Sequence, residues 1–340
     1  MDKIETIWKM RECSMQDVKE LAYDLEIPIS VAQVMITRGI DSVDKAEQFL
    51  DLKINKLHNP MTLPDAEIAI KRISKAIDTG EKIFVWGDYD VDGASSTSIL
   101  ARFLRNFTSN FFIFIPDRIQ DGYGPNLKIF EDIASRGVKL IITVDCGTTS
   151  FEPIEYAKSK NIDVVVIDHH QSTETLPKAN AIVNPNRFDE TSNLTYLCAA
   201  GVAFLVLSGI VTRFREQDFF KKKNIQEPDL LSYLDLVALG TVCDVVPLQG
   251  LNRAFVFQGL KVLQKRNNLG IKTLSDVANI NSKISTYHLG YVIGPKINAG
   301  GRIGKSNHGA NLLLTEDPEI AFKISKELNQ LNEKRKSIYI

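Results

Sequence analysis

Short apolar runs alternate with longer amphipathic segments through the middle of the chain. The runs are Lys82 to Trp86, Phe111 to Ile115, Leu140 to Val144 and Val164 to Ile167. The predicted helices between them are 94–107, 126–136 and a segment that continues through Ala157. Nearly all-apolar strands separated by helical crossovers are typical of a parallel sheet with helices on both faces. The pattern therefore predicts an α/β fold with a doubly wound, mainly parallel sheet.

The two flanks of this region are predicted to be helical. In the first 55 or so residues, Ser14 and the pair Asp41-Ser42 have the pattern of helix starts. From Ala199 onward the periodicity is mainly helical, most clearly in Leu231 to Val246 and Ala254 to Gln264. We expect a helical lead-in over residues 1–55 and a main domain over residues 56–315.

The C-terminal segment is predicted to be one more helix. Asp317-Pro318 places a capping residue before a proline at the first helical position. An apolar stripe with spacings of three and four residues follows, made of Ala321, Ile324, Leu328 and Leu331. The sequence suggests no partner for this stripe. We therefore interpret residues 316–340 as the start of a linking helix toward a further domain.

Composition narrows the classes of function. Of the 340 residues, 44% are hydrophobic and 24% charged, which is ordinary for a globular protein. Lys and Arg number 41 and Asp and Glu 42, for a net charge of −1, which excludes a uniformly basic nucleic-acid clamp but not a local basic groove. The four cysteines lie far apart and suggest neither disulfides nor a zinc ribbon. The N-terminus resembles no signal peptide, and the longest apolar stretch, 199–211, is too short for a bilayer. We expect a cytoplasmic protein that does not bind membranes.

Aspartates follow three of the four predicted strands. Asp88, Asp145 and Asp168 stand at these ends, and further acids and histidines lie beside them, namely Asp90, Asp92, His169 and His170. Ligands of open parallel sheets bind beyond the carboxyl ends of the strands. Several acids at one edge repel one another unless a cation compensates their charge. Each group alone also fits a simpler interpretation, either a solvated turn or ordinary histidines, but together they favour a metal site.

The chemistry of these side chains indicates which metal. Carboxylates and imidazoles without a thiolate cluster suit Mn²⁺ or Mg²⁺. Asp244 adds a further acid within an apolar helical context, where either a metal or a helix-packing hydrogen bond would satisfy it. There are enough acids for two ions, an arrangement that suits hydrolysis of phosphoesters.

A second candidate site is the segment Gly294 to Arg302. Its Gly300-Gly301 pair would let the backbone approach a ligand, and the guanidinium of Arg302 suits a phosphate. Lys305 and His308 follow shortly after. A simple turn is the alternative interpretation.

Five motifs, in order along the chain, resemble those of a known superfamily. They are Asp88-Tyr89-Asp90-Val91-Asp92-Gly93, Val144-Asp145-Cys146-Gly147, Asp168-His169-His170, Gly240 to Leu248, and Gly294 to Arg302. Over residues 82–302 the chain resembles the DHH phosphoesterase superfamily and, within it, the RecJ single-strand-specific DNA exonucleases. Cys243 and Gly300 stand where alanine is more usual in these proteins.

The resemblance implies a DHH catalytic domain over residues 56–315 that holds two Mn²⁺ or Mg²⁺ ions. The implied metal ligands are Asp90, Asp92, Asp145, His169 and Asp244, with Asp145 as the bridge. Asp88 stands where many relatives have a histidine, and it is assigned with Asp168 and His170 to the catalytic residues. His170 would face the substrate phosphate, which Arg302, Asn298, Gly300 and Gly301 would hold.

The implied reaction is hydrolysis of single-stranded DNA from its 5′ end, which releases mononucleotides in DNA repair and recombination. A single-strand-binding protein or a helicase is a candidate partner. Alternatives are a DHH-type phosphodiesterase of oligoribonucleotides or cyclic dinucleotides, and a non-catalytic partner in a replication or repair complex. Asp90-Val91-Asp92-Gly93 also resembles the opening motif of haloacid-dehalogenase phosphatases, in which the first aspartate is a nucleophile. That family lacks an Asp-His-His after a later strand.

Overall fold

The computed structural model describes residues 9, 11–54, 59–118, 121–302 and 305–338, which belong to two compact units, Met1–Lys53 and Ile54–Ile340. The first unit contains helices α1 (Met15–Asp24), α2 (Ile29–Ile36) and α3 (Val43–Leu50). The side chains of Ser14 and Ser42 accept hydrogen bonds from the backbones of Asp17 and Lys45, so both predicted helix starts are confirmed. Val18, Leu21 and Ala32 lie in its small apolar core.

The second unit is built on a five-stranded sheet. Its strands are β1 (Ile83–Trp86), β2 (Phe111–Phe114), β3 (Leu140–Val144), β4 (Asp163–Ile167) and β5 (Ala181–Val183). The order is β2-β1-β3-β4-β5, and all neighbours are parallel. The predicted strands are confirmed. The sequence pattern missed β5, because a run of three apolar residues does not stand out from its surroundings.

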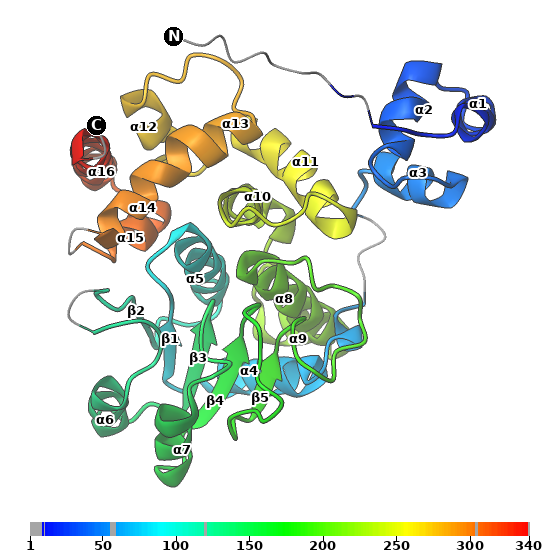
Figure 1. Ribbon diagram of the computed structural model, residues 1–340. Coiled ribbons are helices and arrows are strands. Elements are labelled where there is room, and N and C mark those ends of the chain that lie inside the picture. Colours follow the sequence, from blue (N-terminus) through cyan, green and yellow to red (C-terminus); the bar gives the residue numbers. More distant parts are fainter. Residues whose placement is uncertain (1–8, 10, 55–58, 119–120, 303–304, 339–340) are drawn as a thin grey trace. The chain divides into compact units, whose positions relative to one another are not determined.

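Helices cover both faces of the sheet, as the apolar strands predicted (Figure 1). Ile83 and Val85 of β1 belong to the larger core with α4 (Ala66–Thr79), α5 (Val91–Leu104) and α8 (Ala199–Glu216). Phe84 and Trp86 point to the other face, where α6 (Leu127–Ser135) and α7 (Phe151–Ser159) pack. Because side chains alternate along a strand, a sheet buried on both faces needs apolar residues at every position.

The strand order reverses between β1 and β3. The chain passes from β1 to its neighbour β2 on one side and then returns to β3 on the other. In open α/β sheets this switch point opens a crevice at the carboxyl ends of the strands, where ligands bind. Asp88 follows β1 and Asp145 follows β3, so the first two motifs lie on either side of this crevice.

A set of helices follows the sheet in the chain. These are α9 (Phe219–Lys223), α10 (Leu234–Cys243), α11 (Gly250–Gln264), α12 (Leu269–Val277), α13 (Thr286–His288), α14 (Gly294–Arg302), α15 (His308–Leu314) and α16 (Pro318–Ile338). Short 3₁₀ turns lie at Pro60–Thr62 and Leu230–Tyr233, and a π-helical turn, Leu289–Ile293, joins α13 to α14. None of the described helices is long and apolar enough to cross a membrane.

The prediction that the C-terminal stripe lacks a partner is wrong. Ala321 and Leu328 of α16 are fully buried, and Ile324 is nearly so. The helix packs on α12, α14 and α15. The partners come from residues 269–314, where the sequence pattern was too weak to assign helices. The predicted start of α16 is confirmed, since the Asp317 carboxylate accepts a hydrogen bond from the Glu319 N–H at 2.8 Å.

Candidate metal centre

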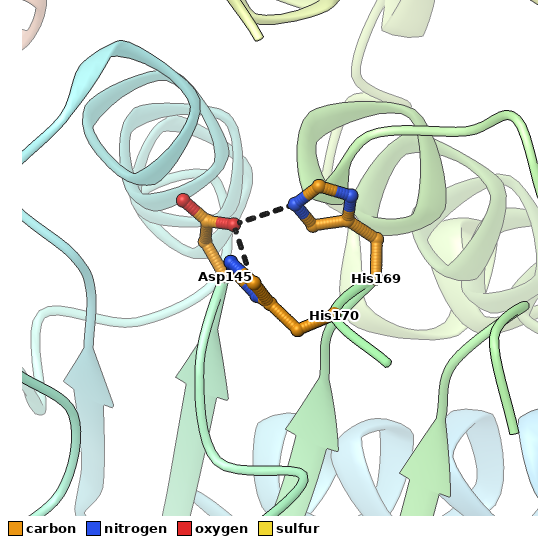
Figure 2. Close-up of side chains that lie close together, drawn as sticks. All are labelled: Asp145, His169 and His170. Carbon is orange, nitrogen blue, oxygen red and sulfur yellow. Dashed lines mark ion pairs between the residues drawn. The ribbon is translucent and has the colours of Figure 1, made fainter. Parts of the chain in front are cut away.

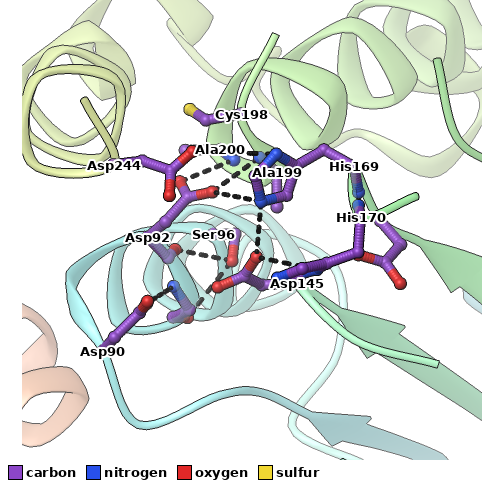
Figure 3. A network of polar contacts seen from close by, with 12 residues as sticks. Asp90, Asp92, Ser96, Asp145, His169, His170, Cys198, Ala199, Ala200 and Asp244 are labelled. Atoms are coloured by element: carbon purple, nitrogen blue, oxygen red, sulfur yellow. Dashed lines mark hydrogen bonds and ion pairs between the residues drawn. The ribbon is translucent and has the colours of Figure 1, made fainter. Parts of the chain in front are cut away.

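The loop after β1 brings three aspartates to the crevice. Asp90 caps α5, where its Oδ1 accepts a hydrogen bond from the Gly93 N–H at 2.9 Å. A Cβ at Gly93 would lie 2.6 Å from the backbone carbonyl of Asp88, so only glycine permits this tight turn. Asp92, in the first turn of α5, accepts hydrogen bonds from the first two N–H groups of α8, those of Ala199 at 2.6 Å and Ala200 at 3.0 Å (Figure 3). The N-terminus of α8 thus fixes the orientation of Asp92.

Asp145 lies at the centre of the site. It directly follows β3, is 1% exposed and has a left-handed backbone with φ of 61°. Aspartate tolerates this conformation better than most residues, but it still costs free energy. Asp145 Oδ1 lies 3.2 Å from His169 Nε2 and 3.9 Å from His170 Nδ1 (Figure 2).

His169 connects Asp145 to the other acids. Its Nε2 lies 3.8 Å from Asp92 Oδ2, and its Nδ1 lies 3.7 Å from Asp244 Oδ2 (Figure 3). Asp244 comes directly after α10, so the fourth motif reaches the site from a helix rather than from the sheet.

Three groups of side chains could each hold a metal ion. Within each group, the possible ligand atoms lie within 4.8 Å of one another. The groups are Asp88, Asp90 and Asp145; Asp92, His169 and Asp244; and Asp145, His169 and His170. Asp145 and His169 each belong to two groups, so the groups are contiguous. The structure brings all five predicted ligands together, and Asp88 and His170 lie beside them.

The electrostatics of the cluster fit a bound cation. Burial, followed by the charge of Asp90, raises the pKa of Asp88 from 3.8 to about 7. Burial and the neighbouring Asp92 raise the pKa of Asp244 to about 8, and that of Asp145 well above its ordinary value. The buried Oδ1 atoms of Asp88 and Asp145 form no hydrogen bond within the described part of the chain. Buried carboxylate oxygens without a donor are costly unless a cation or a proton compensates them.

Asp168 differs from these acids because donors surround it. Its Oδ2 accepts from the N–H and hydroxyl of Thr148 at 3.0 and 2.6 Å, and its Oδ1 contacts His170 Nδ1 at 2.8 Å. Burial alone would raise the pKa of Asp168, but these hydrogen bonds hold it below its ordinary value. The hydrogen bond between Asp168 and His170 also raises the pKa of His170. This geometry favours a positioning role for Asp168, and its assignment as a catalytic residue stays a prediction.

Several residues of the site were missed by the sequence analysis. Thr148, Asn184 and Asn186 form hydrogen bonds with the Asp168-His169-His170 segment, and the hydroxyl of Tyr123 lies 3.4 Å from both ring nitrogens of His170. The signal for the two asparagines was Asn184-Pro185-Asn186, directly after β5. It was not noticed because β5 itself was not predicted.

The segment Gly294 to Arg302 is helical rather than a simple turn, and its assignment to the substrate phosphate stays a prediction. It is helix α14, and a Cβ at Gly300 or Gly301 would lie 3.0 Å from Leu328 or 3.1 Å from Tyr89, so both glycines allow close packing. Asn298 Oδ1 accepts a hydrogen bond from the Val91 N–H at 3.1 Å and thereby supports the first motif. Arg302 is exposed in the last turn of the helix.

Lys305 and His308 have a partner that the sequence did not reveal. Lys305 Nζ lies 2.6 Å and His308 Nε2 2.9 Å from Glu327 Oε2 on α16. These two side chains therefore fasten α16 to the segment that follows α14.

Mn²⁺ should stabilise this protein more at high pH than at low pH. Asp88 and Asp244 have raised pKa values of about 7 and 8, so the metal-free folded state holds more protons than the unfolded state above their ordinary value of 3.8. The contribution of these two protonated carboxyl groups to the stability of the metal-free protein is fully present below pH 3.8. It is lost as the pH rises through their pKa values of about 7 and about 8. A cation replaces these protons. The increase in Tm on adding Mn²⁺ to EDTA-treated protein should therefore grow between about pH 6 and about pH 8.5. A pH-independent increase in Tm would contradict this explanation.

Comparisons with known proteins show which family the chain resembles. Residues 82–241 match the family described as DHH family, N-terminal domain. The chain is 34% identical to the single-stranded-DNA-specific exonuclease RecJ of Bacillus subtilis, over 97% of this chain and 40% of that protein. It is 37% identical to RecJ of Escherichia coli, over 92% of this chain and 54% of that protein. The chain thus spans about half the length of the curated relatives that it matches.

Two solved structures have the same fold. A crystal structure of exonuclease RecJ bound to manganese matches with a TM-score of 0.71 and 31% identity, over 81% of this chain and 67% of that one. RecJ in complex with Mn²⁺ from Thermus thermophilus matches with a TM-score of 0.77 and 28% identity, over 96% of this chain and 45% of that one. Both matched structures contain the metal for which the acids and imidazoles of this chain are suited.

Proposed function

The chain belongs to the RecJ family of DHH phosphoesterases, and on that premise we propose that it hydrolyses phosphodiester bonds of single-stranded DNA from the 5′ end and releases mononucleotides, using two Mn²⁺ or Mg²⁺ ions. One observation carries the proposal. Asp145 has a buried Oδ1 that accepts no hydrogen bond from a described residue, and its ligand atoms lie within 4.8 Å of those of Asp88 and Asp90 in one group and of His169 in another. Such a carboxylate suits a bridge between two cations.

We assign the residues of the site to metal binding and to contact with the substrate phosphate. Asp88, Asp90 and Asp145 would hold one ion, and Asp92, His169 and Asp244 the other, with Asp145 as the bridge. When bound, two such ions supply hydroxide from water and neutralise charge on the reacting phosphate. Asp168 Oδ1 contacts Nδ1 of His170, and the hydroxyl of the half-exposed Tyr123 lies 3.4 Å from both ring nitrogens. We assign His170 to the substrate phosphate at this position.

We also propose a further domain, a partner and a cellular process for this protein. The relatives are about twice as long as this chain, and we propose that residues 316–340 lead toward a further domain that helps to hold DNA. A single-strand-binding protein or a helicase is the proposed partner, in DNA repair and recombination in the cytoplasm. The named relatives favour this function over the phosphatase and oligoribonucleotide alternatives.

A nuclease assay tests the proposal. Short 5′-labelled single-stranded DNA is incubated with the chain in Mn²⁺, in Mg²⁺ or in EDTA, and the products are separated by size. We expect labelled mononucleotides from the first time points, and only with a metal. Label that first appears in progressively shortened oligonucleotides would show the opposite polarity, and no metal-dependent product would contradict the proposed function.

Arg302 should contribute one phosphate contact if it holds the substrate strand. Arg302→Ala should then reduce the dependence of binding on salt by about one counterion, measured as the slope of log affinity against log salt. Arg136→Ala is a suitable control. Arg136 is also exposed, but it lies at the amino ends of the strands, away from the metal site. Lys82, which directly precedes β1, donates a hydrogen bond from Nζ to the carbonyl oxygen of Arg136 at 2.8 Å. Equal slopes for Arg302→Ala and wild type would leave Arg302 without a role in binding.

A further inference from the structure

Two asparagines run beside the segment that carries the two histidines. In the pairing of β4 with β5, Ile167 lies next to Val183, and the Asp168 N–H donates a hydrogen bond to the Val183 carbonyl at 3.1 Å. The chain then continues as Asn184-Pro185-Asn186 alongside Asp168-His169-His170. The Ser172 N–H donates to the Asn186 carbonyl at 3.3 Å, which keeps the two segments together beyond the strands.

The side-chain amide of Asn184 is fully buried, and both its nitrogen and its oxygen form hydrogen bonds. Its Nδ2 donates to Thr148 Oγ1 and to the carbonyl oxygen of His170, both at 2.8 Å. Its Oδ1 accepts from the Asn186 N–H at 2.7 Å. A side chain with other donors and acceptors would leave buried polar groups unpaired at this position.

Thr148 extends these contacts to the imidazole of His170. Because Thr148 Oγ1 accepts a hydrogen bond from Asn184, its own proton is donated to Asp168 Oδ2. Asp168 Oδ1 in turn contacts His170 Nδ1. Asn184 therefore positions His170 in two ways. It donates a hydrogen bond directly to the His170 carbonyl oxygen, and it acts on the His170 ring through Thr148 and Asp168.

Asn186 contacts the other histidine. Its Nδ2 donates a hydrogen bond to the His169 carbonyl at 2.5 Å and lies 3.4 Å from the Thr195 carbonyl. The His169 ring faces Asp92, Asp145 and Asp244. Moving the His169 carbonyl would shift the ring relative to all three acids.

We infer that Asn184 and Asn186 are positioning residues with separate tasks: Asn184 orients His170 toward the substrate phosphate, and Asn186 orients His169 as a metal ligand. The inference rests on the proposed function for its assignment of the two histidines. It leads to different measurable losses, because a misplaced His170 affects turnover whereas a misplaced His169 affects metal affinity.

The test compares Asn184→Ala and Asn186→Ala with a control at the other end of the same strand. Asn180 precedes β5, and it accepts a hydrogen bond from the Val164 N–H and donates one to Asp163, both at 2.8 Å. It therefore fastens the same strand pair but lies at the amino ends of the strands, away from the histidines. For each variant, Mn²⁺ affinity is measured by calorimetry, Tm in EDTA, and kcat and KM on a short oligonucleotide.

Asn186→Ala should weaken Mn²⁺ binding about 10- to 100-fold, as expected for a residue that orients a metal ligand. Asn184→Ala should lower kcat by about the same factor with KM and Mn²⁺ affinity close to wild type. Asn180→Ala should change neither. The inference is wrong if the two variants show the same pattern of losses, or if neither differs from Asn180→Ala. A wild-type chain without nuclease activity would contradict the proposed function instead, while the Mn²⁺ titrations would still test Asn186.

A second pair of variants covers the case in which Asn184→Ala does not fold. Thr148→Ser keeps the hydroxyl between Asn184 and Asp168, whereas Thr148→Val removes it with little change in shape. Thr148→Ser should retain the wild-type kcat, and Thr148→Val should show the loss expected for Asn184→Ala. Equal kcat values for these two variants would overturn the part of the inference in which Asn184 acts on the His170 ring through Thr148 and Asp168.

Discussion

Asp145→Asn should abolish turnover and make the metal-free protein more stable. Loss of one electrostatic contact in a transition state typically costs about 10²- to 10³-fold in kcat, and we expect about 10³-fold or more here, because Asp145 belongs to two groups of metal ligands. Stability should rise because burial and the neighbouring acids raise the pKa of Asp145, so its charge is costly without a cation. Asparagine also tolerates the left-handed backbone at this position.

The measurements are kcat in Mn²⁺ and Tm in EDTA at about pH 8, at which the ordinary carboxyl is ionised. Asp235→Asn is the matched control. Asp235 is also a buried acid with a pKa raised by burial, to about 6, but it lies 4.0 Å from Arg102 and outside the three groups of ligands. The control should keep its turnover. An active Asp145→Asn enzyme would contradict the two-metal site.

Gly240→Ala should disturb the metal site by direct contact with Asp92. A Cβ at Gly240 in α10 would lie 2.5 Å from Asp92 Oδ1 and 2.9 Å from the Ala200 Cβ. The added methyl group would separate α10 from α8 and displace the carboxylate of Asp92, which accepts hydrogen bonds from the start of α8. Overpacking of this kind costs about 1–3 kcal/mol of unfolding free energy. We expect a lower denaturant midpoint and weaker Mn²⁺ binding.

Gly201→Ala separates this effect from a general effect of alanine in a buried helix. Gly201 lies in α8 next to Ala200, and the nearest atom to its Cβ would be Leu197 Cδ2 at an ordinary 3.4 Å. Because alanine favours helices over glycine, this variant should be as stable as wild type or more stable. If Gly240→Ala and Gly201→Ala behave alike, the close approach of α10 to Asp92 has no functional role.

The parallel sheet and the metal-binding residues could be predicted because both leave local signals. β1, β3 and β4 are apolar at nearly every position, and an aspartate follows each of them within two residues. The sheet topology then places the carboxyl ends of neighbouring strands at one edge. Asp244 is different, since it comes directly after α10. Its apolar helical context left ligation and helix packing both open, and only the resemblance of its motif assigned it as a ligand.

The remaining features depend on contacts between distant segments. Asn184 lies 36 residues from Thr148, so the hydrogen bond between them has no signature in either local pattern. The two glycines of α14 suggested a close approach of the backbone to a ligand, and their packing against Leu328 and Tyr89 could not be predicted because these residues are remote in the sequence. The stripe of α16 lacked an obvious partner because α12, α14 and α15 are short helices with weak periodicity.

The position of bound manganese tests the central claim most directly. Crystals of the chain soaked in Mn²⁺, with anomalous diffraction data collected at the manganese edge, would locate each ion independently of activity. We predict two peaks in the crevice at the carboxyl ends of β1 and β3, one bordered by Asp88, Asp90 and Asp145 and the other by Asp92, His169 and Asp244. The absence of a peak among these residues, or ordered manganese only elsewhere in the chain, would contradict the two-metal site.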